Sequence, residues 1–282
     1  MKLLRYGPAG QEKPGILDNA GTIRDLSAYL SDLDGNALAP TRLDKLSKLD
    51  LAVLPPVRDN VRIGACVAGV SKFICVGLNY SDHAAETGAP VPVEPILFQK
   101  ATTAIIGPHD DVMLPRNASK GDWEVELGIV IGSRARYVTQ QDSLQYVAGF
   151  CVVNDVSERA FQSERGGQWT KGKSSDTFGP IGPWLVTRDE VADPQALAMH
   201  LDVNGVRKQT GNTRTMIFNV AFLVSYISEF MTLLPGDIIA TGTPPGVGLG
   251  MKPPEFLKPG DVMQLGIEGL GMQTQKVVTF RS

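Results

Sequence analysis

Glycine and proline interrupt the apolar runs of this chain at short intervals, and this feature limits the fold more than any other. The 282 residues include 30 glycines and 19 prolines, so few segments can form a long, uninterrupted helix. The apolar runs that remain are short, as is typical of strands joined by turns. The sequence therefore predicts a strand-rich α+β fold with few helices, and it argues against a helix bundle or a coiled coil.

The expected elements follow from apolar patterns and from the residues that end them. Strands are expected at 3–6, 15–17, 73–76, 124–131, 147–153, 184–187, 198–203, 237–240, 262–267 and 275–280. Helices are expected at 23–33, 81–86, 141–146, 156–164 and 216–233. Residues 1–68 are expected to form a small N-terminal α/β unit, and residues 69–282 the larger domain that carries the candidate chemistry.

Charge and composition exclude several classes of partner. The formal net charge is −3 and no run of basic residues occurs, so we expect no nucleic-acid partner. Polar residues interrupt the most apolar stretch, 216–234, which predicts a buried helix and no membrane partner. The N-terminus lacks the apolar segment of a secretory signal. Cys66, Cys75 and Cys151 match neither a zinc site nor a disulfide framework, so a cytoplasmic protein with free thiols is expected.

Acidic residues alternate with apolar residues along one expected strand. Asp122, Glu124 and Glu126 would point to the same face, roughly 7 Å apart. Such clustering is unfavourable unless a cation or water screens the charges. Asp155 follows an apolar run at another strand end, so these acids could form an all-oxygen site for Mg²⁺ or Mn²⁺. A solvated strand face opposite a core is the alternative, because the pattern is common.

His83 and Glu86 are three residues apart on an expected helix. At this spacing a carboxylate can orient an imidazole and raise its basicity. An exposed ion pair on a surface helix is the alternative interpretation.

Residues 167–174 match the phosphate-loop pattern G-x-x-x-x-G-K-[ST] letter for letter. That motif requires an apolar strand before it and a helix after it. Here a polar stretch precedes it, and Pro180 and Pro183 follow it, so the nucleotide interpretation is rejected. Lys173 remains a candidate to bind an anionic group of a substrate.

Residues 234–248 form an apolar run that leads into a glycine-rich turn. Backbone N–H groups and hydroxyls in such a turn can bind an anion such as a carboxylate. The glycine spacing does not fit a dinucleotide-binding fingerprint.

Taken in order, these segments resemble motifs of the fumarylacetoacetate hydrolase family. The matching stretches are 76–83, 98–104, 122–128, 154–162, 172–180 and 234–248. The resemblance covers roughly residues 70–280. Ala101 stands where proline is usual and Ser175 where phenylalanine is common, and neither departure removes a functional group.

The resemblance implies layered mixed β-sheets, a divalent metal (Mg²⁺, with Mn²⁺ as the alternative) and a homodimer. It implies three metal ligands: Glu124, Glu126 and Asp155. It also implies a catalytic dyad on a lid over residues 83–95 and an active-site lysine: His83, Glu86 and Lys173. The substrate contacts that it implies are Arg159, Gln162, Thr243, Tyr80 and Lys100.

The activity implied by this resemblance is cleavage of the C3–C4 bond of a 2,4-dioxo acid to pyruvate and a carboxylic acid. The substrate would be an acylpyruvate or a 2,4-diketo-3-deoxy sugar acid, such as the L-rhamnonate or L-fuconate derivative of sugar acid catabolism. The alternatives are ureidoglycolate lyase, oxaloacetate decarboxylase or dioic acid isomerase activity. A non-catalytic metal-binding or metabolite-binding protein is a further alternative, against which the set of acids, dyad and lysine argues.

Overall fold

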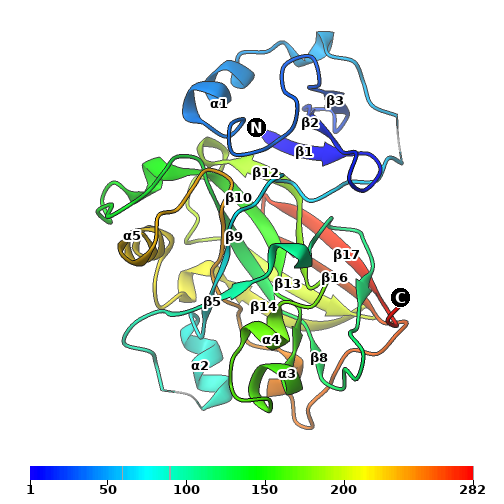
Figure 1. The fold of residues 1–282 in the computed structure, drawn as a ribbon, viewed down its shortest axis with the longest axis vertical. Coiled ribbons are helices and arrows are strands. Elements are labelled where there is room, and N and C mark those ends of the chain that lie inside the picture. The colour runs from blue at the N-terminus through cyan, green and yellow to red at the C-terminus, as the bar shows by residue number, and fades with distance from the viewer. Residues whose placement is uncertain (59, 89, 282) are drawn as a thin grey trace.

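The computed structural model describes residues 1–58, 60–88 and 90–281, and two packed β-sheets dominate it (Figure 1). Within the described residues, the larger sheet has ten strands. Its order is β3 (Ile23–Asp25), β2 (Lys13–Leu17), β1 (Lys2–Tyr6), β12 (Gly179–Thr187), β10 (Val147–Asn154), β9 (Val125–Ile131), β15 (Ile238–Ala240), β4 (Phe73–Gly77) and β5 (Ile96–Lys100), with β6 (Ile105–Ile106) beside β12.

The second sheet and a short ribbon complete the strand structure. The second sheet has the order β14 (Val206–Asn212), β13 (Ala198–Val203), β16 (Val262–Ile267), β17 (Gly271–Val278) and β7 (Val112–Met113). The ribbon pairs β8 (Gly121–Asp122) with β11 (Ser157–Glu158). The expected strand-rich fold with few helices is confirmed.

The helices are short and lie at the margins of the sheets. They are α1 (Pro40–Ser47), α2 (Ser81–Thr87), α3 (Arg159–Ser163), α4 (Thr170–Lys173) and α5 (Val220–Phe230). Single 3₁₀ turns are η1 (Leu51–Val53), η2 (Thr102–Ala104), η3 (Ser143–Tyr146), η4 (Arg188–Glu190), η5 (Thr213–Thr215) and η6 (Gly248–Gly250). In the part of the chain that the structure describes, no helix combines the length and the apolar character needed to cross a membrane.

Strands β9 and β10 are buried on both faces, which explains their nearly continuous apolar sequences. Leu127 and Ile129 of β9 belong to the apolar cluster shared with the second sheet. Val130 faces the other way, into the cluster shared with the N-terminal residues. Because side chains alternate, Glu126 and Val130 lie on the same face of β9. The acidic end of the strand is therefore directed away from the second sheet.

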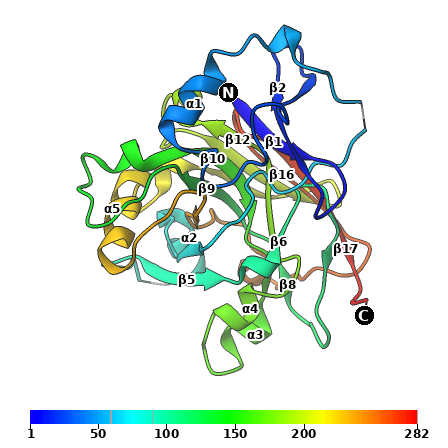
Figure 2. The same cartoon turned by 45° about the horizontal axis from the view of Figure 1, so that its top comes forward.

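The N-terminal residues continue the larger sheet. Strand β1 pairs antiparallel with β12, and Lys2 is in register with Val186 (Figure 2). Leu3 and Ile16 pack in one cluster with Val130 of β9. The expected α/β composition of this unit is present, whereas the domain boundary at residue 68 stays a prediction.

Four expected helices differ from the structure, and the one at 216–233 is shortened to α5. The helix at 23–33 is wrong: Ile23–Asp25 is strand β3, held by pairing with β2, and Asp25 Oδ1 accepts the Ser27 N–H in the turn that follows. The helix at 156–164 is shorter, because Ser157–Glu158 pairs with β8 and the Glu158 side chain caps α3. The helix at 141–146 is only the turn η3. Ala89, within the expected lid, lies outside the described residues.

Candidate active site and metal centre

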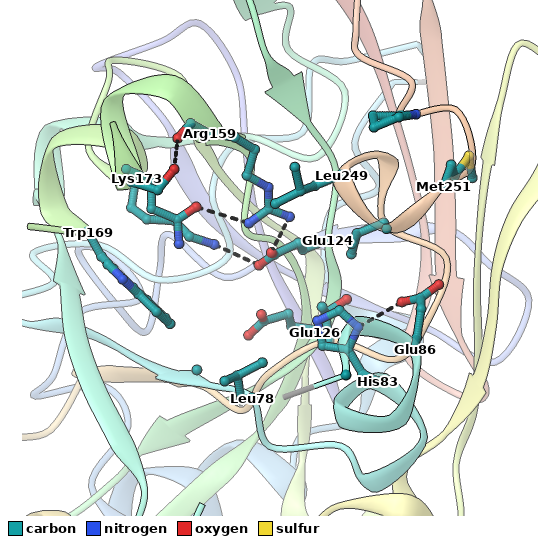
Figure 3. Close-up of a pocket in the computed structure, with 18 of the residues that line it drawn as sticks. Leu78, His83, Glu86, Glu124, Glu126, Arg159, Trp169, Lys173, Leu249 and Met251 are labelled. Carbon is teal, nitrogen blue, oxygen red and sulfur yellow. Dashed lines mark hydrogen bonds and ion pairs between the residues drawn. The ribbon is translucent and has the colours of Figure 1, made fainter. Parts of the chain in front are cut away.

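A cavity of about 900 Å³ lies at the acidic end of β9, next to α2, α3 and α4 and the loop 246–251. Figure 3 shows its charged side chains in the middle and apolar side chains on either side. Most of the residues singled out in the sequence line it: His83, Glu86, Glu124, Glu126, Arg159, Gln162, Lys173 and Thr243. The topology explains this convergence, since β4, β9, β10 and β15 are neighbours in one sheet.

Three buried carboxylates form the centre of the site. Glu124 immediately precedes β9, Glu126 lies on it, and Asp155 follows the adjacent strand β10. Glu126 is close to the end of β10 because it is in register with Val153. One oxygen atom of each of the three carboxylates lies within 4.8 Å of the others. The expected grouping of these residues is therefore present.

Three basic side chains neutralise part of this cluster. Lys173 Nζ lies 2.7 Å from Glu124 Oε2 and 2.7 Å from Asp155 Oδ2. Lys100 Nζ lies 2.5 Å from the other oxygen of Asp155. Arg159 contacts Glu124 Oε1 at 2.7 Å. Among the described lysines and arginines, none forms an ion pair with Glu126.

The pKa values reflect this uneven pairing. Burial would raise the pKa of Glu124, but Lys173 and Arg159 outweigh it and lower the pKa to about 2. Burial, Asp155 and Glu124 raise the pKa of Glu126 well above its ordinary value. Burial disfavours the charged Lys173, yet Asp155 and Glu124 raise its pKa to about 12. Lys173 therefore stays protonated, and Glu126 has no direct ion pair with a described basic side chain to offset its charge.

This donor set fits a divalent cation with oxygen ligands. Mg²⁺ and Mn²⁺ prefer carboxylate oxygens and retain positions for water and substrate. A cation held by Glu124, Glu126 and Asp155 would supply the positive charge that Glu126 lacks. The buried, closely spaced carboxylates are the observation that supports this fit, and they do not form the solvated strand face considered as the alternative.

The His83–Glu86 pair faces the cavity (Figure 3). His83 Nδ1 and Glu86 Oε2 are 2.9 Å apart, and the His83 side chain is only 9% exposed. Glu86 Oε1 also accepts the Gly246 N–H at 2.9 Å. The carboxylate is thus fixed between the helix and the glycine-rich loop, and the pair does not lie on an exposed helix surface.

The other expected substrate contacts divide into two groups. Arg159 and Gln162 line the cavity and bind each other at 3.1 Å, and Thr243 lines it while donating to the Val125 carbonyl. Tyr80 and Lys100 do not line the cavity. The Tyr80 hydroxyl contacts the Met199 sulfur, and Lys100 donates to Asp155 and to the Val156 carbonyl.

Asp122 is the residue whose place the alternating pattern predicts least well. The chain is irregular between β8 and β9, so Asp122 does not join the three central carboxylates. It is fully buried, and its oxygens accept from Arg159 Nε at 2.8 Å and from the N–H groups of Gly248 and Leu249 at 2.7 and 3.0 Å. Its position in the acidic strand was the only sequence signal that pointed to Asp122, and it did not predict these bonds to Arg159 and the loop.

Apart from Ser163 and Lys252, the remaining side chains that line the cavity are apolar, and none of them was assigned to the site from the sequence. Trp169 packs edge-on against Phe98, with ring centroids 5.3 Å apart. A Cβ at Gly77 would lie 2.4 Å from the Trp169 ring, so a glycine is needed for the indole to lie there.

The segment that matches the phosphate-loop pattern contains α4 and leads into strand β12, as its rejection predicted.

Comparison with known proteins agrees with this architecture. The family model described as fumarylacetoacetate (FAA) hydrolase C-terminal matches residues 72–278. A protein of Burkholderia orbicola named "Putative hydrolase" is 63% identical over 277 residues, which are 98% of each chain. The chain belongs to the fumarylacetoacetate hydrolase family, and it is an enzyme of that family.

Three solved structures share the fold over nearly their whole length. A fumarylacetoacetate hydrolase from Exiguobacterium antarcticum has a TM-score of 0.89 at 37% identity, covering 99% of this chain and 100% of that one. A probable 2-hydroxyhepta-2,4-diene-1,7-dioate isomerase from Mycobacterium abscessus has a TM-score of 0.85 at 31% identity, and the match covers all of both chains. A maleylpyruvate hydrolase from Sphingobium sp. SYK-6, solved with manganese(II) and pyruvate, has a TM-score of 0.83 at 29% identity, and this match also covers all of both chains.

Proposed function

We propose that this enzyme hydrolyses the C3–C4 bond of a 2,4-dioxo acid, releasing pyruvate and a carboxylic acid, with Mg²⁺ or alternatively Mn²⁺ as cofactor. The observation that carries the proposal is the arrangement of three buried carboxylates and Lys173 in one cavity with the His83–Glu86 pair. The manganese and pyruvate present in the structure of the related maleylpyruvate hydrolase support it.

The charge balance of the site favours a small anionic substrate. The three clustered carboxylates and Asp122 carry four negative charges, whereas the basic side chains around them carry three positive charges, on Lys100, Lys173 and Arg159. A divalent cation would reverse this to an excess of one positive charge. A 2-oxo acid carries one negative charge, so its binding would restore neutrality inside a buried site, where unbalanced charge is costly.

The proposed reaction starts with a water molecule next to His83. Glu86 orients the imidazole through Nδ1, and the proposed acceptor of a proton from this water, as it attacks C4, is Nε2. The C3–C4 bond then breaks, and its electron pair moves to C3, giving the enolate of pyruvate. C3 takes up a proton, and the tail leaves as a carboxylic acid.

Lys173 and Arg159 stabilise the negative charge of the enolate. Both are buried, positively charged and fixed by ion pairs, so they need little reorganisation as charge develops. A bound divalent cation would add Lewis-acid stabilisation of the same charge. Thr243 and the glycine-rich turn that follows it line the cavity and are the proposed contacts for the substrate carboxylate.

Isomerisation of a dienol diacid is the second candidate, because a related structure carries that name. An isomerase also passes through an enolate but requires no attacking water. Ureidoglycolate cleavage and oxaloacetate decarboxylation stay alternative hypotheses, as does a sugar-acid tail for the substrate. The homodimer and the cytoplasmic location stay predictions.

The test is pyruvate release from acetylpyruvate and from 2,4-diketo-3-deoxy-L-rhamnonate, each with Mg²⁺ and with a chelator. We expect metal-dependent pyruvate from at least one of them. Absence of pyruvate from both, together with metal-dependent loss of a dienol diacid, would favour the isomerase. Metal-dependent loss of oxaloacetate alone would favour the decarboxylase.

A further inference from the structure

The backbone of the loop 246–251 is bound by two carboxylates, those of Glu86 and Asp122. Its Gly246 N–H donates to Glu86 of the dyad. Its Gly248 and Leu249 N–H groups donate to Asp122, which also binds Arg159. The loop is therefore connected through Glu86 to His83, the proposed base, and through Asp122 to Arg159 at the central carboxylates.

Glycine is required at Gly248, and Gly250 also allows a close approach. A Cβ at Gly248 would lie 2.1 Å from the Glu255 carbonyl oxygen and 2.8 Å from Asp122 Oδ1. A Cβ at Gly250 would lie 3.0 Å from Glu86 Cδ, so this side chain would have to shift. The loop backbone thus packs closely against both carboxylates.

Most of the side chains that this segment presents are apolar. Val247, Leu249, Met251 and Pro254 line the cavity from this direction, and Lys252 adds one charged side chain beyond the loop. Figure 3 places Leu249 and Met251 across the cavity from Trp169, with the carboxylates between them. Although Leu249 lines the cavity, its side chain is 48% exposed, so a ligand could bury a large part of it.

The proposed reaction determines which part of a substrate meets this loop. The carboxylate end lies at the central charged groups, and C4 lies at His83. The substituent on C4 must then continue past the dyad. Glu86 is the member of the dyad that contacts Gly246 and packs on Gly250, so the substituent extends along the loop.

We infer that the loop 246–251 selects the acyl tail of the substrate and favours an apolar one, and that Asp122 is the positioning residue that fixes the loop relative to Arg159. This inference rests on the proposed function, because it takes the position of C4 from it. A polyhydroxylated tail would leave hydroxyl groups against Val247, Leu249 and Met251 without hydrogen-bond partners, which is unfavourable.

The experiment measures kcat/KM for acylpyruvates whose tails grow from methyl to pentyl, and for hydroxylated and carboxylate-ended tails of equal length. We expect a rise of up to about fourfold per methylene in the wild type. Leu249→Ala should flatten this rise, with a larger loss of kcat/KM for the pentyl tail than for the methyl tail of acetylpyruvate. Asp122→Asn should flatten the rise too and also lower kcat for every tail, through Arg159. The double variant should lose little further selectivity, because both changes act on one loop.

Two matched controls separate positioning from general destabilisation. Leu234 is a partly exposed leucine outside the cavity, and Asp237 is a buried aspartate that binds Ser71 and Lys72. Leu234→Ala and Asp237→Asn should keep the wild-type dependence on tail length. Equal loss for all tails in Leu249→Ala, an unchanged slope in Asp122→Asn, or a preference for hydroxylated or carboxylate-ended tails would overturn the inference.

Binding of unbranched 2-oxo acids of increasing length, measured by calorimetry on the Mg²⁺-loaded protein, distinguishes the two proposals. These acids lack the C4 carbonyl and cannot be hydrolysed. Affinity that rises with length in the wild type and not in Leu249→Ala supports the loop assignment, even if no acylpyruvate is cleaved and the proposed function fails. Affinity independent of length in the wild type overturns it.

Discussion

Replacing Lys100 with methionine tests whether this lysine stabilises Asp155 in the fold, where the structure places it, or contacts the substrate. Its Nζ lies 2.5 Å from Asp155 Oδ1 and 3.0 Å from the Val156 carbonyl oxygen, and the side chain is buried. Methionine keeps much of the volume and removes the charge. Breaking a buried ion pair costs about 3–5 kcal/mol. We expect the lower end, about 3 kcal/mol, because Lys173 still contacts the other oxygen of Asp155.

This loss predicts that Tm falls by roughly 6–12 °C, at about 2–4 °C per kcal/mol for a domain approaching this size. Mg²⁺ should restore part of the stability, because the proposed site exists only in the folded protein and a bound cation there would supply charge next to Asp155. Differential scanning fluorimetry with and without Mg²⁺ measures both effects. The matched control is Lys120→Met, which removes an exposed ion pair with Glu164 and should change Tm little. An unchanged Tm with a raised KM would refute the reasoning and make Lys100 a substrate contact.

Three further predictions concern the base, the aromatic wall and acid stability. His83→Gln should lower kcat by roughly 10²–10⁴-fold and leave Mg²⁺ affinity unchanged, as steady-state kinetics and calorimetry would show; retention of more than a tenth of kcat would contradict the role of the base. Gly77→Ala should displace Trp169, because the ring would lie 2.4 Å from the new Cβ, and it should raise KM more than Gly88→Ala. Both glycines line the cavity near α2, so equal KM values for the two variants would contradict this prediction. Burial opposes ionisation of Glu12, but Arg62 outweighs it and lowers its pKa. Glu12 therefore stabilises the fold above its unfolded pKa, and this contribution is lost as pH falls through the lower folded pKa. Glu12→Gln should weaken the pH dependence of the free energy of unfolding between about pH 6 and pH 3, measured by urea denaturation, and an unchanged dependence would count against the ion pair.

The central carboxylates could be predicted from the sequence because strand geometry is local. Alternation places Glu124 and Glu126 on one face, and the apolar run before Asp155 predicts a strand end. The pairing of β9 with β10, which brings these residues together, is a tertiary event, but hydrophobic strands adjacent in the chain are commonly neighbours in a sheet. The spacing of His83 and Glu86 and the basic residue at the end of the phosphate-loop match, Lys173, made these residues candidates, and the resemblance to the family then supplied their roles.

The features that were missed depend on contacts between distant segments. The expected helix at 23–33 is replaced by strand β3 because pairing with β2 outweighs the local amphipathic pattern. Asp122 leaves the acidic face because the chain is irregular between β8 and β9. Its binding to the Gly248 N–H joins residues 126 positions apart, and no local pattern predicts such a contact.

Binding of Mg²⁺ to the wild type and to Glu126→Gln, measured by isothermal titration calorimetry, tests the central claim most directly. Of the three clustered carboxylates, Glu126 is the one that forms no ion pair with a described lysine or arginine, so metal binding should depend on it strongly. We expect one site per chain in the wild type, a loss of affinity of at least tenfold in Glu126→Gln, and a parallel loss of pyruvate release from acetylpyruvate. Equal Mg²⁺ affinity in the two proteins, or full turnover by the variant, would contradict it.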